Sequence, residues 1–212
     1  RTCIITDEYY RDANVDFEKT SKSIKRKIKE KGLFVSQGFI GSNKKSLTTT
    51  LGREGSDYSA AIFAHALNAE SVTIWKDVRG VLNADPRYFN KTKLLNKISY
   101  EEAIELAFYG ASVIHPKTLQ PLKKKNIPLF VKSFLSPSKA GTIISKKDDK
   151  VRNIPSHIVK WNRVLLKISS NDFSFIVEKK VSLIFSMLSK YKMKVELIQN
   201  SAISFSVVLN NK

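Results

Sequence analysis

The stretch TTTLGREGSDYSAAIFAHAL (residues 48–67) changes from a polar, glycine-punctuated segment into an apolar run with small side chains at helical spacing. That spacing predicts a helix over 57–67. Its close-packing face contains Ala60, Ala61, Ala64 and Leu67. The first turn of a helix has unpaired N–H groups and a partial positive charge, so it binds phosphate or carboxylate groups readily. We therefore expect a ligand where the polar segment meets the helix.

Arg53, Ser56 and Asp57 gather at this junction, and Gly52 and Gly55 allow the backbone to approach a ligand closely. The Arg53 guanidinium is able to make a two-pronged bond to a carboxylate or phosphate. A carboxylate beside an anion site is useful if it holds a substrate ammonium, so Arg53 and Asp57 together suit a zwitterionic amino acid. Spacing alone fits a plainer alternative equally well, with Ser56 as an N-cap and Asp57 as a first-turn dipole residue.

Length and composition restrict the class of protein. The 212 residues, 42% of them hydrophobic, are enough for one good core, or for a larger and a smaller one. We expect no transmembrane helix, because no run of about 18 apolar residues occurs. There is no apolar signal core, and the single cysteine, Cys3, forms no disulfide framework, so we expect a cytoplasmic protein.

The net charge of +18 comes from 37 Lys and Arg against 19 Asp and Glu. Such a chain could attract nucleic acid, acidic membrane or anionic metabolites. The lysines, however, lie mainly in helix-like surface stretches, and no nucleic-acid-binding module pattern is present. We expect neither nucleic acid nor membrane as a partner.

Strands and helices alternate through the first two thirds of the chain. The expected helices are 16–31, 57–67, 99–110 and 116–125, and the expected strands are 33–39, 71–75 and 127–134. Ser99 and Glu102 have the spacing of a capping box, and Gly110 is a suitable helix end. This alternation predicts an α/β domain with a largely parallel sheet.

The composition changes between Ser136 and Ser156, where prolines and the run SKKDDKVRN predict a linker, which we place at residues 146–160. A strand at 164–170, an amphipathic helix at 178–191 and two strands within 194–210 are expected beyond it. The order β-α-β-β is the opening of a ferredoxin-like unit. The expected division is therefore one domain over 1–145 and a partial second domain over 161–212.

A second constellation, IWKDVRGVLNADPR (residues 74–87), follows the expected strand 71–75. Asp77 comes directly after this strand, at the end where ligands bind in open α/β sheets. Lys76, Arg79 and Arg87 offer positive charge suited to a polyphosphate. Without other evidence, these residues are equally typical of an ordinary strand end and turn.

The motifs QGFIGS, TTTLGREGSDYSAA, IWKDVRGVLNADPR, ISYEEAIELAFYGASVIHPKTL and IPLFVKSF occur in the order seen in aspartate kinases, and residues 1–145 closely resemble that family. Residues after about 164, notably VELIQNSAISFSV, resemble the ACT regulatory domain that follows in these enzymes. The resemblance implies a partial amino acid kinase fold, with an open sheet and helices on both faces, and then a partial ferredoxin-like ACT domain. It also implies ATP-dependent phosphorylation of the L-aspartate side chain to 4-phospho-L-aspartate, the first step toward lysine, threonine and methionine, with Mg²⁺ accompanying ATP.

The resemblance also assigns roles to individual residues. It implies that Arg53 and Asp57 are catalytic and that Arg53, Ser56 and Asp57 bind aspartate. The positions that line the nucleotide site are Lys76, Asp77, Leu82, Arg87, Ser112 and Val113. No protein ligands for a metal are expected. His115, before Pro116 at a helix start, is expected to be structural or pocket-lining rather than a general base.

In the ACT region, Glu196, Asn200 and Ser201 match positions near an effector site for lysine or threonine, and Asp172 and Phe173 lie in the preceding loop. ACT units usually pair between subunits, so we expect a homodimer through these domains. A plainer alternative makes Asn200 and Ser201 a hairpin turn beside a strand core.

The sequence departs from the family pattern at three positions. Glu54 replaces a glycine common in GRGGSD, Leu82 stands where a tyrosine is common, and Ser112 stands where a lysine is usual. The KFGG-type segment with which the family begins does not occur in these residues. We therefore expect no kinase activity from the 212 residues alone. The alternative is a non-catalytic regulatory subunit or fragment of an aspartate kinase that binds an amino-acid effector.

Overall fold

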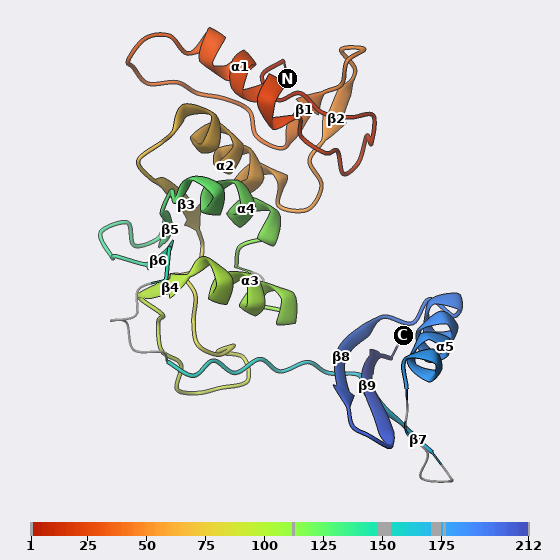
Figure 1. Ribbon diagram of the computed structural model, residues 1–212. Helices are drawn as coiled ribbons and strands as arrows, with labels where there is room; N and C mark the ends of the chain where they lie inside the picture. The colour runs from red at the N-terminus through yellow and green to blue at the C-terminus, as the bar shows by residue number, and fades with distance from the viewer. Residues whose placement is uncertain (1, 112, 148–153, 171–174, 176, 212) are drawn as a thin grey trace. The chain divides into compact units, whose positions relative to one another are not determined.

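The computed structural model describes residues 2–111, 113–147, 154–170, 175 and 177–211 (Figure 1). The chain divides into two compact units between Ile158 and Val159, within the predicted linker 146–160. Residues 148–153 of that linker lie outside the described residues. Among the helices that are described, none is long and apolar enough to cross a membrane.

The first unit is built on a four-stranded sheet with the order β3-β5-β6-β4. The strands are β3 (Val72–Lys76), β4 (Lys97–Ser99), β5 (Leu129–Ser133) and β6 (Thr142–Ser145). The pairs β3–β5 and β4–β6 are parallel, whereas β5–β6 is antiparallel. The predicted α/β fold with a largely parallel sheet is confirmed. The short strands β4 and β6 were not expected. Strand β6 lies in the region of changed composition after Ser136 and ends directly before the predicted linker 146–160.

Three helices accompany this sheet: α2 (Gly55–Leu67), α3 (Tyr100–Tyr109) and α4 (Pro116–Lys125). All three were predicted to within two residues at each end. The capping box of α3 is present, with Glu102 N donating to Ser99 Oγ at 3.0 Å and Ser99 N donating to Glu102 Oε2 at 2.6 Å. Gly110, with φ of 122°, ends α3 as expected.

The N-terminal part contains α1 (Phe17–Lys27) and the antiparallel pair of β1 (Ile40–Ser42) and β2 (Thr48–Thr50). Helix α1 begins after its N-cap Asp16 but ends four residues before the predicted end. The predicted strand 33–39 is wrong. Leu33 is 95% exposed and Val35 is 94% exposed, and the segment has no strand partner in the described ranges. An apolar run becomes a strand only where a neighbouring strand takes its hydrogen bonds.

Helix α2 lies between two hydrophobic cores. Ala61 and Ala64 belong to the core shared with the sheet, α3 and α4. Ile62 and Ala66 belong to a second core that includes residues of α1. The alanine face predicted from the sequence is therefore correct, except that Leu67 is 39% exposed. Packing on two sides fixes the position of the first turn of this helix.

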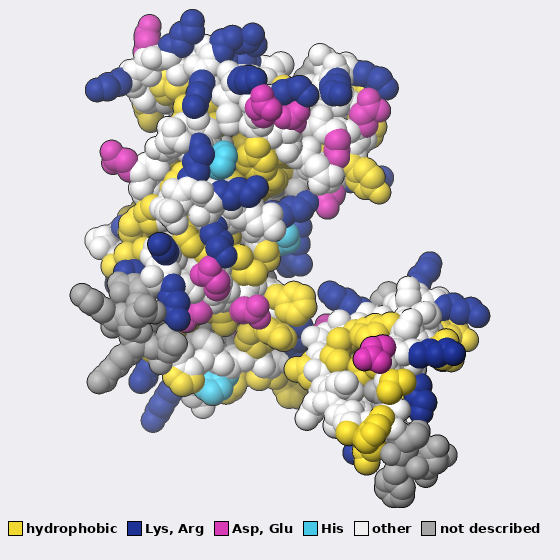
Figure 2. Space-filling view, in the orientation of Figure 1, with side chains coloured by type: hydrophobic (Ala, Val, Ile, Leu, Met, Phe, Trp, Pro, Cys, Tyr) yellow, Lys and Arg dark blue, Asp and Glu magenta, His cyan; other side chains and the backbone are white. Residues whose placement is uncertain are grey.

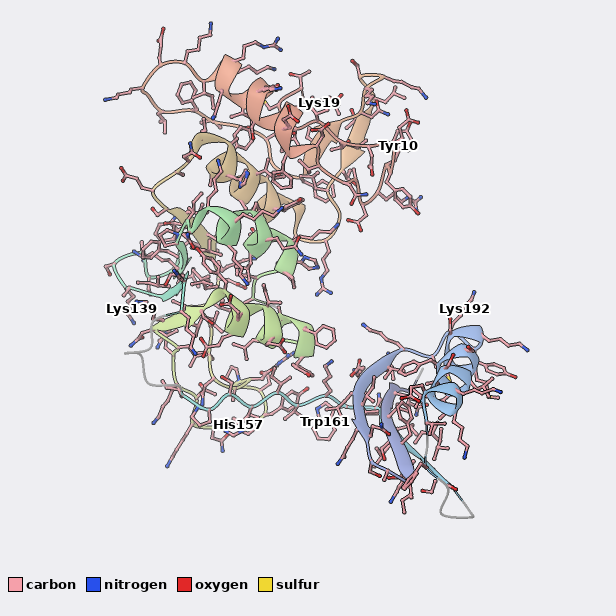
Figure 3. All side chains as sticks on the ribbon, in the orientation of Figure 1. Tyr10, Lys19, Lys139, His157, Trp161 and Lys192 are labelled. Atoms are coloured by element: carbon pink, nitrogen blue, oxygen red, sulfur yellow. The ribbon has the colours of Figure 1, made fainter. Side chains whose placement is uncertain are left out.

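The segment before the unit boundary packs with the first unit. The N–H of His157, a residue labelled in Figure 3, donates to Asn83 O at 2.7 Å. The His157 ring stacks on the ring of Phe89, with the centroids 5.8 Å apart. Ala84 and His157 also form a β-bridge. Residues near His157 thus belong to the folded unit, although the sequence predicted a linker there.

The second unit contains β7 (Arg163–Ser169), α5 (Glu178–Lys190), β8 (Val195–Asn200) and β9 (Ser204–Asn210). Its antiparallel sheet has the order β7-β9-β8. Leu188 of α5 is buried with Phe205, Val207 and Leu209 of β9. The predicted order β-α-β-β is confirmed. The loop residues Asp172 and Phe173 lie outside the described residues.

The capping box offers a test of the fold. Replacement Ser99→Ala removes an N-cap acceptor and should cost about 1 kcal/mol of the free energy of unfolding, measured by urea unfolding. Ser145 is the matched control, because it pairs with Ser99 across β4 and β6 and its hydroxyl makes only a 3.4 Å contact with Lys146 O. Equal losses in Ser99→Ala and Ser145→Ala would contradict a capping role.

Candidate active site

The turn between β2 and α2 is tightly packed against other parts of the first unit. Gly52 has a positive φ of 78°, and a Cβ there would overlap the carboxylate of Asp12. A Cβ on Gly55 would lie 2.7 Å from a ring carbon of Phe39. The left-handed backbone of Gly52 favours glycine, and a side chain at position 55 would require Phe39 to move; the close neighbours of both glycines are protein groups.

Helix α2 begins at Gly55, two residues earlier than the sequence pattern suggested. The N-cap is Glu54, in the left-handed region with φ of 52° and ψ of 34°, and no side chain caps this end. The N-cap role considered for Ser56 is wrong, because Ser56 is exposed within the helix. The backbone N–H groups of Ser56 and Asp57 have no acceptor among the described residues.

Arg53 precedes this helix and is exposed. In the part of the chain that the structure describes, its guanidinium has neither an ion-pair nor a hydrogen-bond partner. A guanidinium and two backbone amides are thus available together at the positive end of a helix dipole. This is a suitable arrangement of donors for a carboxylate or phosphate.

Asp57 and Lys76 meet although they come from different elements. Lys76 Nζ lies 2.7 Å from Asp57 Oδ2, and the side chains are 25% and 14% exposed. Asp57 Oδ2 is buried and accepts no well-aligned hydrogen bond within the described residues, so the contact with Lys76 is one of charge and proximity. Because Lys76 ends β3, the pair joins the expected amino-acid site to the expected nucleotide site.

The other expected nucleotide residues are more dispersed. Asp77 and Arg79 are exposed on the segment after β3. Arg87 is engaged by Asp85, with Nη2 2.6 Å from Oδ2 and Nε donating to both carboxylate oxygens. This contact also lowers the pKa of Asp85, chiefly through the hydrogen bond from Arg87.

Two further nucleotide positions have structural contacts. Leu82 is half-buried and forms a β-bridge with Leu94. Val113 packs partly buried against the main core. Ser112 lies outside the described residues. The structure therefore brings Lys76 together with Asp57 of the expected amino-acid site. In contrast, Arg87 pairs with Asp85, Leu82 with Leu94, and Val113 with the main core.

Several residues near the turn were not identified from the sequence. Lys117 of α4 forms an ion pair with Asp12, the residue that faces Gly52. The N–H of His115 donates to Glu54 Oε2 at 2.9 Å, and His115 Nδ1 accepts from Lys117 N at 3.2 Å. His115 is thus the N-cap of α4, which agrees with the structural role expected of it. Only the unusual Glu54 was visible as a signal in the sequence.

In the second unit, Glu196 is already paired. Its Oε2 accepts from Arg163 Nε at 2.7 Å and from Lys160 Nζ at 3.1 Å, and its side chain is 12% exposed. The hydrogen bond from Arg163 is the main cause of the lowered pKa of Glu196. Asn200 ends β8, and Ser201 N donates to Ser204 O at 2.8 Å in the following turn. An effector role for these three residues stays a prediction.

Charged side chains are spread over the face shown in Figure 2, where Lys and Arg are interspersed with Asp and Glu. Across the described ranges, no group of three or more His, Cys, Asp or Glu side chains is placed to hold a metal ion.

The fold and the unpaired donors at the turn before α2 can be compared with those of known proteins. The sequence model of the amino acid kinase family matches residues 3–133, and the chain belongs to this family. Within it, the chain is 39% identical over 183 residues to lysine-sensitive aspartokinase 3 of Escherichia coli, which covers 84% of this chain and 40% of that protein.

Solved aspartokinase structures are also similar. The structure of E. coli aspartokinase III in complex with aspartate and ADP has a TM-score of 0.77 at 34% identity, covering 100% of this chain and 48% of that one. The structure of aspartate kinase from Clostridium acetobutylicum has a TM-score of 0.88 at 30% identity, and the match covers 99% of this chain and 48% of that one. The chain thus spans about half the length of these relatives or less.

The contact between Asp57 and Lys76 is testable by a double-mutant cycle. The variants Asp57→Asn, Lys76→Met and their combination should give a coupling energy of about 1 kcal/mol in urea unfolding, because the pair is largely removed from water. The exposed pair Glu18–Lys22 on α1 is the control and should give about 0.3 kcal/mol. A coupling no larger than in the control pair would contradict the proximity of Asp57 and Lys76.

Proposed function

We propose that the protein containing this chain is an aspartate kinase that transfers the γ-phosphoryl group of ATP to the side-chain carboxylate of L-aspartate. The products are 4-phospho-L-aspartate and ADP. The observation that carries the proposal is the turn before α2, where Arg53 and two helix amides are available beside Asp57 and Lys76. The solved relative with aspartate and ADP supports the same substrates.

Each group at the turn has a role in this reaction. The Arg53 guanidinium and the Ser56 and Asp57 amides bind one aspartate carboxylate. The Asp57 carboxylate binds the ammonium group of the substrate aspartate while it also contacts the ammonium group of Lys76. The Lys76 ammonium, at the end of β3, then lies between the two substrates and neutralises negative charge as phosphate and carboxylate approach.

The rest of the nucleotide site would come from the segments after β3 and before α4. Its remaining residues are Asp77, Leu82, Arg87, Ser112 and Val113. Phosphoryl transfer needs mainly positioning and charge neutralisation. Mg²⁺ would arrive with ATP, because this ion keeps several waters and binds mainly to substrate phosphates.

We further propose that the second unit is an ACT domain that binds an amino-acid effector near Glu196, Asn200 and Ser201. The lysine-sensitive relative makes lysine the first candidate and threonine the second. Because Arg163 and Lys160 already contact Glu196, an effector ammonium must compete with them or share the carboxylate.

Pairing of two such units is part of this proposal. Leu165, Val208 and Leu197 are register neighbours across β7, β9 and β8. On β9, Val208 alternates with Val207 and Leu209, which pack under α5, so Val208 lies on the opposite face of the sheet. Its register neighbours Leu165 and Leu197 lie on that same face and form a row with it. Leu165 is 69% exposed and Leu197 is 48% exposed. This apolar row fits a homodimer interface, and the cytoplasm fits the proposed metabolic role.

Kinase activity is tested on the whole protein by ADP formation, with hydroxylamine trapping of the acyl phosphate. We expect turnover that requires both aspartate and ATP. Arg53→Lys should raise the KM for aspartate roughly tenfold, because lysine keeps the charge but loses the two-pronged bond. The KM for ATP should change by less than about twofold, and ADP formation that ignores aspartate would overturn the proposal.

Effector binding is tested by thermal unfolding of the whole protein. Saturating lysine, at about 100 times its dissociation constant, should stabilise the protein by about 2.7 kcal/mol through linkage. Glu196→Gln should reduce the shift in melting temperature, with threonine measured in parallel. If lysine gives no shift in the unaltered protein, it is removed as the effector.

A further inference from the structure

Glu54 occupies a backbone conformation that favours glycine. Its φ of 52° and ψ of 34° are left-handed, and a residue with a side chain pays conformational energy there. Glu54 is also the position at which GREGSD departs from the GRGGSD pattern of the resembling family. The chain therefore has a glutamate where glycine would be less strained. We infer that an interaction of the carboxylate offsets this strain.

The carboxylate of Glu54 contacts a distant segment. Its Oε2 accepts the backbone N–H of His115 at 2.9 Å, across 61 residues of sequence. His115 is the N-cap of α4, and Pro116 follows it as the first helical residue. A negative charge near the start of α4 is favourable because of the helix dipole. The hydrogen bond thus fixes the backbone at His115, directly before α4.

The contact connects the two substrate regions of the proposed kinase. Glu54 directly follows Arg53, which binds aspartate under the proposed function. Val113, an expected nucleotide-lining position, lies two residues before His115. An ion pair between Asp12 and Lys117 also ties the N-terminal segment that faces Gly52 to α4. Among the described residues, the hydrogen bond of Glu54 is a direct link from the turn to the start of α4.

We propose that Glu54 is a positioning residue that holds residues 113–115, which include the nucleotide-lining position Val113, against the aspartate-binding turn through the backbone N–H of His115. This inference rests on the proposed function. Removing the link should weaken ATP binding even though Glu54 lies in the aspartate-binding turn. A residue that served only the stability of the turn would not have this effect.

Three substitutions separate the hydrogen bond from backbone strain. Glu54→Gln keeps the length and an oxygen acceptor. Glu54→Asn tolerates the left-handed conformation but is one methylene too short, and Glu54→Gly relieves the strain and removes the acceptor. Glu101→Gln, which removes a carboxylate from a surface ion pair with Lys123 on α3 and α4, is the control for charge loss.

Steady-state kinetics of the whole protein provide the first readout. We expect Glu54→Asn and Glu54→Gly to raise the KM for ATP by the same factor of about three or more, with the melting temperature of Glu54→Gly not lowered. Glu54→Gln and Glu101→Gln should keep the KM for ATP within about twofold of the unaltered protein. An increase in Glu54→Gly alone would assign the effect to backbone freedom and overturn the proposal.

Hydrogen–deuterium exchange of a peptide covering 109–117 provides a readout that does not need activity. The amide of His115 should exchange faster in Glu54→Asn and Glu54→Gly than in Glu54→Gln. Unchanged exchange in all variants would overturn the link itself. If the unaltered protein shows no aspartate-dependent use of ATP, the proposed function fails, while the exchange comparison still decides whether Glu54 holds His115.

Discussion

The packing of α2 between two cores is the constraint on which the candidate site depends. Ala61 and Ala64 bring the helix backbone close to the sheet, and Ile62 on the other side is completely buried against the core of α1. Burying one such side chain contributes about 1.5–3 kcal/mol, whereas an ion pair at or near the surface contributes about 0–1 kcal/mol. The packing of α2 therefore places Asp57 beside Lys76, and the ion pair does not determine where the helix lies.

Local signals predicted the parts of the fold that are controlled locally. The capping box of Ser99 and Glu102, the helix end at Gly110 and Pro116 at the start of α4 all depend on neighbours within four residues, and all are present. The strand expected at 33–39 failed because apolar composition does not identify which strand will take its hydrogen bonds. Strands β4 and β6, with three and four residues, are too short to show a period.

In the candidate site, too, the sequence identified residues that are close along the chain but not the contacts between distant segments. Arg53 and Asp57 were identified because both lie at one helix start, where chemistry and spacing are read together. The contacts of Asp12 with Lys117 and of Glu54 with His115 span 105 and 61 residues, so no local pattern contains them. Ser56 was considered as the N-cap because of its residue preference, but the left-handed backbone at Glu54 moves the start of the helix.

Within the part of the chain that the structure describes, the acidic side chains around the turn all have partners, whereas the arginine does not. Asp12, Glu54 and Asp57 each contact a donor from another element, namely Lys117, the N–H of His115 and Lys76. Arg53 has no such partner among the described residues, so the positive charge next to the free helix amides is the one left for a ligand. Under the proposed function, a dicarboxylic amino acid suits this imbalance better than a neutral one. Its first carboxylate meets Arg53, its ammonium meets Asp57, and its second carboxylate lies near Lys76, where the phosphoryl group must arrive.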